Sequence, residues 1–237
     1  MTRSSAVLPA TRVAAGVRAA TPWAIVGVAV VVAAGLALRF VVGGPMGPIG
    51  PDEWWHGIAS VTRGSLPYAI AVFCAEIGGG VGAAATAAIA VALLIVLRRP
   101  RDAAAVATAM LLGVAASEAL KALVLRPRPW DQLYVSSGSS FPSGHSLGAA
   151  ALAVSVILVV AAANRMPRTA VTWATVLGIA WILLMMWSRT ALHVHWFTDV
   201  VAGALLGASI AVLSRRFWFR DRAAAAPRTR APRPRRR

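Results

Sequence analysis

Six apolar runs, separated by short polar or charged segments, dominate this chain of 237 residues. A helix needs about 20 mostly apolar residues to cross a bilayer. Charged residues make up only 14% of the chain, whereas a soluble domain carries about a quarter. The chain therefore cannot fold as an ordinary soluble globule, and we expect an all-α, polytopic membrane protein with six transmembrane helices. The expected spans cover residues 23–42, 67–97, 103–125, 146–163, 169–187 and 199–213.

The spans form one domain between two basic segments. We expect a basic cytoplasmic N-terminus over residues 1–21, a six-span domain over residues 22–213, and a disordered Arg-rich cytoplasmic tail over residues 214–237. We expect the tail to be attracted to anionic lipid of the inner leaflet. Specific nucleic-acid binding is not expected, because no nucleic-acid-binding fold accompanies the charge.

The basic residues are divided unequally between the two sides of the membrane. With six spans, both termini and the links at residues 98–102 and 164–168 share one side, and most of the basic residues lie there. The positive-inside rule assigns that side to the cytoplasm. The Ala- and Arg-rich composition is typical of a GC-rich bacterial genome, so we expect a multi-pass protein of the bacterial inner (plasma) membrane.

A second group of polar residues gathers at the outer ends of spans three to six. Polar groups next to hydrocarbon are costly, so such a cluster indicates a functional site. Three segments carry it, and they contain Lys121, Arg128 and Pro129; Pro142, Ser143, Gly144 and His145; and Ser188, Arg189, His195 and Asp199.

The basic members of this cluster indicate an anion site. Lys121, Arg128 and Arg189 are cations without as many carboxylates nearby, and the planar fork of arginine suits phosphate oxygens. Ser143 and Gly144 stand at the expected start of a helix, where free N–H groups and the helix dipole favour an anion. Gly144 would let the backbone approach the ligand closely.

The histidines add a nucleophile and an acid. His195 and Asp199 are four residues apart, so on a helix they share a face, and a carboxylate beside an imidazole makes it a better base or nucleophile. His145 comes from another segment and could protonate a leaving oxygen. The combination suits phosphoryl transfer through a phosphohistidine. Carboxylates are too few to suggest a metal centre, and we expect no metal and no other cofactor.

In order and spacing, the three segments resemble the signature motifs of the type-2 phosphatidic acid phosphatase superfamily. The resemblance runs from Lys121 to Asp199, about a third of the chain. It implies that His195 attacks phosphorus, that Asp199 orients it, and that His145 is the general acid in a reaction that needs no metal. The phosphate-binding positions that it implies are Lys121, Arg128, Ser143, Gly144 and Arg189. Soluble haloperoxidases share these motifs with vanadate bound, but six apolar spans argue against that branch.

The expected substrate is a lipid phosphate or pyrophosphate held from the outer leaflet. Phosphatidic-acid-like phospholipids and polyprenyl pyrophosphates both fit, because the motif residues are expected to bind the phosphate and say almost nothing about the lipid tail. A polyprenyl-phosphoryl sugar phosphate as substrate, or transfer of the phosphoryl group to another acceptor, remain alternatives. A non-catalytic transporter, or a scaffold that recruits partners through the tail, is the alternative of another class. The oligomeric state stays open.

A few polar residues outside the motifs carry expectations of their own. Glu76 and Glu118 are expected in structural hydrogen bonds at similar depth, with each other or with Lys121. Arg126 is expected either to aid substrate capture or to anchor the membrane interface.

The histidines outside the motifs are expected to be structural. His56 follows a Trp pair and fits an interfacial belt better than a ligand site, and His193 is expected to be structural or interfacial. The three glycines at residues 78–80 are expected to bend the second span or to admit close packing. Cys74 is the only cysteine, so a disulfide within the chain is excluded.

Overall fold

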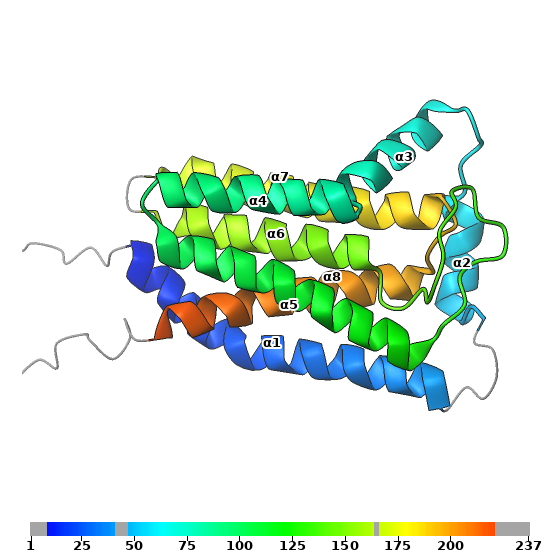
Figure 1. Ribbon diagram of the computed structural model, residues 1–237, viewed down its shortest axis with the longest axis horizontal. Coiled ribbons are helices and arrows are strands. Elements are labelled where there is room, and N and C mark those ends of the chain that lie inside the picture. The colour runs from blue at the N-terminus through cyan, green and yellow to red at the C-terminus, as the bar shows by residue number, and fades with distance from the viewer. Residues whose placement is uncertain (1–8, 41–46, 164–165, 221–237) are drawn as a thin grey trace, which may run out of the picture.

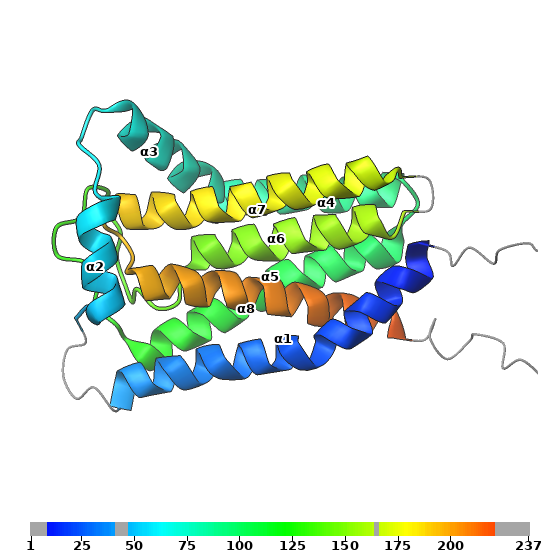
Figure 2. The same ribbon diagram turned by 180° about the vertical axis from the view of Figure 1, so that it is seen from behind.

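The computed structural model describes residues 9–40, 47–163 and 166–220. Within these ranges the chain is helical and has no strand, as expected from the sequence. Most helices run side by side along the long axis of the molecule, as Figures 1 and 2 show from two sides. The helices are α1 (Pro9–Phe40), α2 (Gly50–Ala59), α3 (Leu66–Gly78), α4 (Gly80–Val96), α5 (Pro100–Val124), α6 (Gly144–Ala161), α7 (Arg168–Ala191) and α8 (Phe197–Trp218).

Five of these helices are long and apolar enough to cross a membrane, and α3 with α4 makes a sixth, bent span. This agrees with the six spans expected from the sequence. Large apolar side chains such as Ile89 of α4 and Leu177 of α7 remain exposed on the outside of the bundle. In water such a surface would be costly, but it suits contact with lipid.

Two helices extend beyond their apolar runs. Helix α1 begins at Pro9, well before the apolar run that starts at residue 23, and α8 continues to Trp218. Alanine and arginine are strong helix formers, so a helix that the bilayer stabilises continues into the polar flanks. Parts of the expected basic N-terminus and basic tail are therefore helical. Residues 1–8 and 221–237 of those segments lie outside the described residues.

The bend in the second span falls at the glycines, as expected. Helix α3 ends at Gly78 and α4 begins at Gly80, and the two axes differ by 60°. A Cβ on Gly82 would overlap the carbonyl oxygens of Glu76 and Ile77, so the backbone of α4 approaches that of α3 too closely for a side chain. As a result, α3 leans away from the bundle at the end where α2 lies (Figure 1).

Helices α6 and α8 pack closely because α8 carries glycines at the contact. A Cβ on Gly203 or Gly207 would overlap the carbonyl oxygens of Ser143 and Leu147. The N–H of Ser143 donates to the carbonyl oxygen of Asp199 over 3.0 Å, which joins the starts of the two helices. The first turns of α6 and α8 therefore lie next to each other at one end of the bundle.

The two ends of the bundle differ. Helix α2, the loop over residues 125–143 and the turn between α7 and α8 gather at one end, whereas α1 begins and α8 ends at the other (Figure 1). At that second end, Arg215 of α8 pairs with Asp102 of α5 over 2.7 Å. This arrangement puts the first and last described helix ends on the same side, as an even number of spans requires.

Candidate active site

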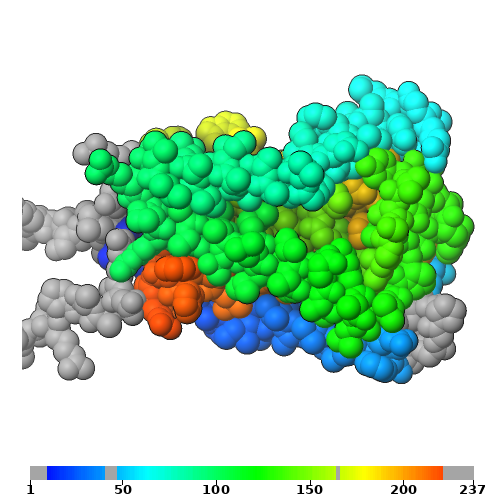
Figure 3. All heavy atoms as spheres, in the orientation of Figure 1, coloured from blue at the N-terminus to red at the C-terminus, as the bar shows by residue number. Residues whose placement is uncertain are grey.

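The three segments expected to form a site meet at the end of the bundle that holds α2. Figure 3 shows a hollow on one face, between α3, α5 and the loop after α5, with orange atoms of later elements lying deeper in it. The expected residues come from six places: Lys121 from the last turn of α5, Arg128 from the following loop, Ser143, Gly144 and His145 from the start of α6, Arg189 from the last turn of α7, His195 from the α7–α8 turn, and Asp199 from the first turn of α8.

The orientation of His195 is set by a main-chain carbonyl. Nδ1 of His195 donates to the carbonyl oxygen of Ser140 over 2.8 Å. A carbonyl only accepts, so Nδ1 carries the proton and Nε2 keeps its lone pair. Nη1 of Arg128 lies 3.2 Å from that Nε2 atom. Burial lowers the pKa of His195 to about 4, against the opposing effect of the Asp199 carboxylate. The site thus holds a neutral imidazole whose free nitrogen faces a cation.

Asp199 lies near His195 but does not accept a hydrogen bond from it. The distance from Oδ2 of Asp199 to Nδ1 of His195 is 3.7 Å, too long for a hydrogen bond. Instead, Oδ2 accepts the N–H of Trp196 over 2.9 Å, and Oδ1 accepts Nη1 of Arg126 over 2.6 Å. Asp199 therefore acts on His195 as a buried charge and by fixing the turn that carries it.

Arg126 belongs to a buried ion-pair network that the sequence interpretation missed. Its side chain is fully buried, and Nη2 donates to Oδ2 of Asp52 over 2.6 Å. The other oxygen of Asp52 accepts the N–H of Thr198 over 2.8 Å. Arg126 is thus neither an exposed capture residue nor an interface anchor. The sequence did hold a signal for this pair. An acidic residue in an apolar chain with few carboxylates needs a cationic partner, and the partner of Asp52 is Arg126.

Arg189 is a buried cation without a matching anion. Its residue is only 2% exposed, and its Nε and Nη1 atoms have no hydrogen-bond partner among the residues that the structure describes. The guanidinium stands over the ring of Tyr134, with Cζ 5.7 Å from the ring centroid. The charge of Arg128 lies close enough to repel it. A buried charge without a partner is costly, so this arrangement favours an anion with several acceptor oxygens.

Lys121 faces the start of α6. A Cβ on Gly144 would stand 3.6 Å from Nζ of Lys121, so the ammonium group and the backbone of this first turn are close together. Ser143 caps the helix, and its hydroxyl accepts the N–H of Ser146 over 3.4 Å. Nζ of Lys121 also pairs with Glu118 over 2.8 Å, one of the contacts of Glu118 that the sequence predicted. The ammonium group and the N-terminus of α6 thus place positive charge on a second side of the site.

His145 reaches the bend of the second span. Its Nε2 atom lies 3.1 Å from the carbonyl oxygen of Ala75, which can only accept, so Nε2 carries a proton. Glu76, the next residue, accepts the hydroxyl of Tyr134 over 2.6 Å. Glu76 therefore makes a structural hydrogen bond, as expected, but its partner is a loop tyrosine and not Glu118 or Lys121. The bent span thus helps to fix both His145 and the ring beneath Arg189.

The sequence also matches a known family. A model of the PAP2 superfamily covers residues 102–223, about half of the chain, and this region contains every site residue described above except Asp52, Ala75 and Glu76. The chain belongs to the PAP2 superfamily. The family resemblance inferred from the three motifs is thereby confirmed.

A curated protein is similar to part of this chain. The undecaprenyl-diphosphatase of Sulfolobus acidocaldarius is 37% identical over 91 residues, which are 38% of this chain and 36% of that protein. The chain thus matches about a third of the length of that curated relative.

Two solved structures share the fold of this chain. The PAP2-type phosphatidylglycerolphosphate phosphatase of Bacillus subtilis superposes with a TM-score of 0.69 and 22% identity, covering 89% of this chain and 100% of that one. LpxE of Aquifex aeolicus gives 0.56 and 20%, covering 68% and 93%. The PAP2 fold of this chain is that of a helical, multi-pass membrane protein.

Proposed function

We propose that the chain is a membrane lipid phosphatase that hydrolyses a lipid phosphomonoester or pyrophosphate through a phosphohistidine on His195. The observation that carries the proposal is the buried guanidinium of Arg189, whose Nε and Nη1 atoms have no partner among the described residues. A phosphoryl group beside Arg128, Arg189 and His195 would supply those acceptors. The relatives named above, two of which are called phosphatases of phosphate-bearing lipids, support the same class of substrate.

The first step forms a covalent intermediate. The lone pair on Nε2 of His195 attacks phosphorus in line with the leaving oxygen, while Arg128 and Arg189 stabilise the charge on the equatorial oxygens. The P–O bond to the leaving group breaks with its electron pair remaining on oxygen. That oxygen takes a proton from Nδ1 of His145, which enters the step as the imidazolium with its Nε2–H donating to the carbonyl oxygen of Ala75, and which the transfer leaves neutral. Lipid alcohol or lipid phosphate departs.

The second step releases inorganic phosphate. His145, now neutral, takes a proton from water as the resulting hydroxide oxygen bonds to phosphorus. The N–P bond breaks, and its electron pair returns to Nε2 of His195. Lys121, Ser143 and Gly144 contribute the ammonium charge and the helix N-terminus that hold the phosphoryl group through both steps. No step of this scheme is routed through a metal ion.

The bent span supports a lipid rather than a water-soluble substrate. Helix α3 leans away from the bundle at the site end (Figure 1), so the hollow lies beside it (Figure 3). The sequence of α3 is largely apolar. A head group could enter the hollow while its tail stayed in the bilayer. Polyprenyl pyrophosphates and phospholipid phosphates both meet this requirement.

We also propose an orientation in the bacterial plasma membrane, with both termini in the cytoplasm and the site outside. The excess of basic residues at the end opposite to the site supports it. The test is labelling of intact cells with a membrane-impermeant maleimide. Ser137→Cys, in the exposed loop near the site, should react, whereas Met166→Cys, beside the start of α7, should react only after lysis. Native Cys74 is buried and should not contribute. The reverse pattern would overturn the orientation.

The activity is tested by phosphate release from detergent-purified protein in the presence of EDTA. The substrates are phosphatidic acid, phosphatidylglycerol phosphate, a polyprenyl pyrophosphate and a polyprenyl-phosphoryl sugar phosphate. His195→Asn runs alongside, because the asparagine amide can still donate to Ser140 but offers no nucleophilic nitrogen. Arg63→Ala, which removes an exposed charge at the same end of the molecule, is the matched control.

The expected result is phosphate release from at least one lipid, lost in His195→Asn and kept in Arg63→Ala. With labelled substrate, the protein should carry acid-labile phosphate that His195→Asn lacks. Phosphate appearing on an added alcohol instead of in solution would identify a transferase. Absence of release and of labelling by every substrate, with folded protein, would overturn the proposal.

A further inference from the structure

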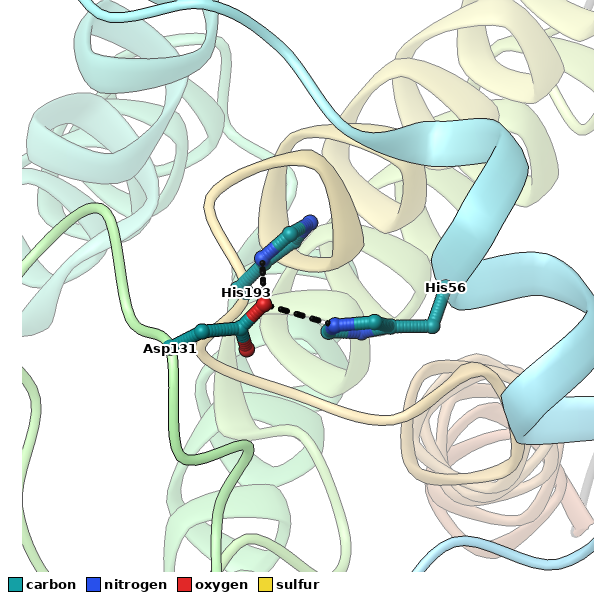
Figure 4. A group of neighbouring side chains, drawn as sticks. All are labelled: His56, Asp131 and His193. Carbon is teal, nitrogen blue, oxygen red and sulfur yellow. Dashed lines mark hydrogen bonds and ion pairs between the residues drawn. The ribbon is translucent and has the colours of Figure 1, made fainter.

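Three polar side chains meet beside the site, on the side where α2 crosses the end of the bundle. Figure 4 shows His56, Asp131 and His193 pointing toward one another from α2, the loop after α5 and the α7–α8 turn. Nε2 of His56 lies 3.0 Å from Oδ2 of Asp131, and Nδ1 of His193 lies 2.9 Å from the same oxygen. Both histidines thus contact the same carboxylate, a contact that the sequence interpretation did not include.

The geometry of this cluster is close to that of a metal site. The two imidazole nitrogens and the carboxylate oxygen all lie within 4.8 Å of one another. Around a tetrahedral zinc ion, with ligand bonds near 2.0–2.1 Å, neighbouring ligand atoms are about 3.4 Å apart. The two N–O distances are therefore only a few tenths of an ångström too short, and small rotations of the side chains would accommodate an ion. Two histidines and a carboxylate are also a common set of zinc ligands.

Packing holds the two imidazoles in place before any ion binds. The ring centroid of His56 lies 6.0 Å from that of Trp130 and 5.5 Å from that of Trp196. The two imidazole centroids are 4.0 Å apart. His193 is buried and adopts a left-handed backbone conformation with φ of 53°, which is uncommon for any residue other than glycine. Rigid, preformed ligands lose little freedom on binding, so the cluster is prepared for a ligand.

The surroundings leave an entry path for the ion. The side chain of Asp131 is 41% exposed, so the carboxylate can meet an ion from solution. Three protein ligands leave the fourth position of a tetrahedral ion open to water. The other face of the cluster is closed by His193 and by the tryptophan rings.

We propose that His56, Asp131 and His193 bind one divalent ion of the zinc class, at a site separate from the phosphate site. His193 lies two residues before His195, and Asp131 lies three residues after Arg128. The bound ion would tie α2 to the two segments that carry the nucleophile and its arginine. It takes part in no reaction step and does not depend on the proposed phosphatase activity.

The test uses Co²⁺ as a spectroscopic probe of the full-length chain, purified without a histidine tag and freed of metal with EDTA. Tetrahedral Co²⁺ gives an intense visible absorption that octahedral aqueous Co²⁺ lacks. We expect this absorption to saturate at one equivalent and to disappear when Zn²⁺ is added. His56→Ala should weaken Co²⁺ binding by more than about tenfold, the scale on which metal sites respond to lost partners. Asp131→Asn should weaken it as well.

Two control variants identify the ligands. His195→Ala removes a histidine of the phosphate site and Glu53→Ala removes an exposed carboxylate of α2, and both should bind Co²⁺ like the parent. Because His193 is buried, His193→Ala could fail to fold, so His56→Gln provides a second variant on the partly exposed helix. Zn²⁺ should raise the unfolding temperature of the parent but not of His56→Gln. Absence of the tetrahedral spectrum, its persistence in His56→Ala, or its loss in His195→Ala would each overturn the proposal.

Discussion

Nδ1 of His195 lies 2.8 Å from the carbonyl oxygen of Ser140, so the main chain fixes the tautomer of this imidazole. The carboxylate of Asp199 stands farther away, with Oδ2 at 3.7 Å from the same nitrogen. The two residues next to His195 therefore have different roles. The carbonyl of Ser140 sets the orientation of the imidazole, and the carboxylate of Asp199 supplies negative charge. This division predicts unequal effects of substitution.

Asp199→Asn should reduce kcat less than His195→Asn. The asparagine oxygen can still accept the N–H of Trp196 while the pair with Arg126 is lost, and Ser140 still holds the imidazole. We expect the loss in kcat for Asp199→Asn to be about 10- to 100-fold smaller than the loss for His195→Asn, the ratio seen when an orienting group and a nucleophile are compared. The measurement is kcat and KM for phosphate release by each variant. Equal losses in the two variants would contradict the division of roles.

Arg189→Met should stabilise the protein while abolishing turnover. The substitution removes a buried, unpaired charge and keeps much of the apolar volume, and similar replacements stabilise proteins by about 1 to 4 kcal/mol. The measurement is the thermal unfolding midpoint in detergent without phosphate, followed by tryptophan fluorescence. Arg63→Met is the control, because Arg63 is exposed and its replacement should leave the midpoint nearly unchanged. A lower midpoint in Arg189→Met would mean that the guanidinium has a structural partner.

Inorganic phosphate should stabilise the parent protein and not Arg189→Met. A ligand at 100 times its Kd adds about 2.7 kcal/mol to the free energy of unfolding, provided that it binds only the folded state. The midpoint should therefore rise with phosphate concentration in the parent. Chloride at equal ionic strength separates specific binding from screening. An equal rise in Arg189→Met would move the phosphate site away from this residue.

Asp52→Ala should destabilise the protein strongly. It leaves Arg126 buried with Asp199 as its remaining anion, and removal of one partner of a buried pair costs about 3 to 5 kcal/mol. Glu53→Ala is the matched control, since it removes the neighbouring carboxylate, which is exposed on the same helix. The free energies of unfolding of the two variants should differ by most of that amount. Similar values for both would show that the Asp52–Arg126 pair contributes little.

Gly207→Ala should loosen the contact between α6 and α8. The new Cβ would overlap the carbonyl oxygen of Leu147, and overpacking of this kind costs about 1 to 3 kcal/mol. Gly16→Ala in α1 is the control, because nothing lies within 4 Å of a Cβ at that position. We expect a lower unfolding midpoint for Gly207→Ala and an unchanged or higher one for Gly16→Ala. If both variants unfold like the parent, the two helices can separate without cost.

The features that the sequence predicted correctly depend on residues close together in the chain. Apolar runs gave the spans, and the three glycines at residues 78–80 predicted the bend. The motif spacing brought Arg128, His145, His195 and Asp199 to one end, because residues near the ends of successive spans must meet there. Helix ends were less accurate, since strong helix formers carried α1 and α8 beyond the apolar runs.

The features that the sequence did not predict are contacts between distant segments. Asp52 and Arg126 pair across 74 positions of the sequence, and neither is one of the residues that define a motif. Asp131 joins His56 and His193 from a third segment, so the role of either histidine could not be read from its neighbours. The carbonyl of Ser140 offers no side chain at all as a signal. Such contacts depend on how α2 and the loop after α5 fold over the bundle.

The bond between Asp52 and Thr198 has a consequence for the order of synthesis. Asp52 is translated early, but the N–H group that donates to it over 2.8 Å belongs to Thr198, in the first turn of the last helix, α8. Until α8 enters the membrane, Asp52 lacks the N–H of Thr198 and Arg126 lacks the carboxylate of Asp199. The turn that carries His195 then lacks the contacts with α8 that hold it. A chain that lacks α8 therefore lacks Asp199 and the contacts that hold the turn carrying His195. The last span thus completes the buried network and the candidate site together.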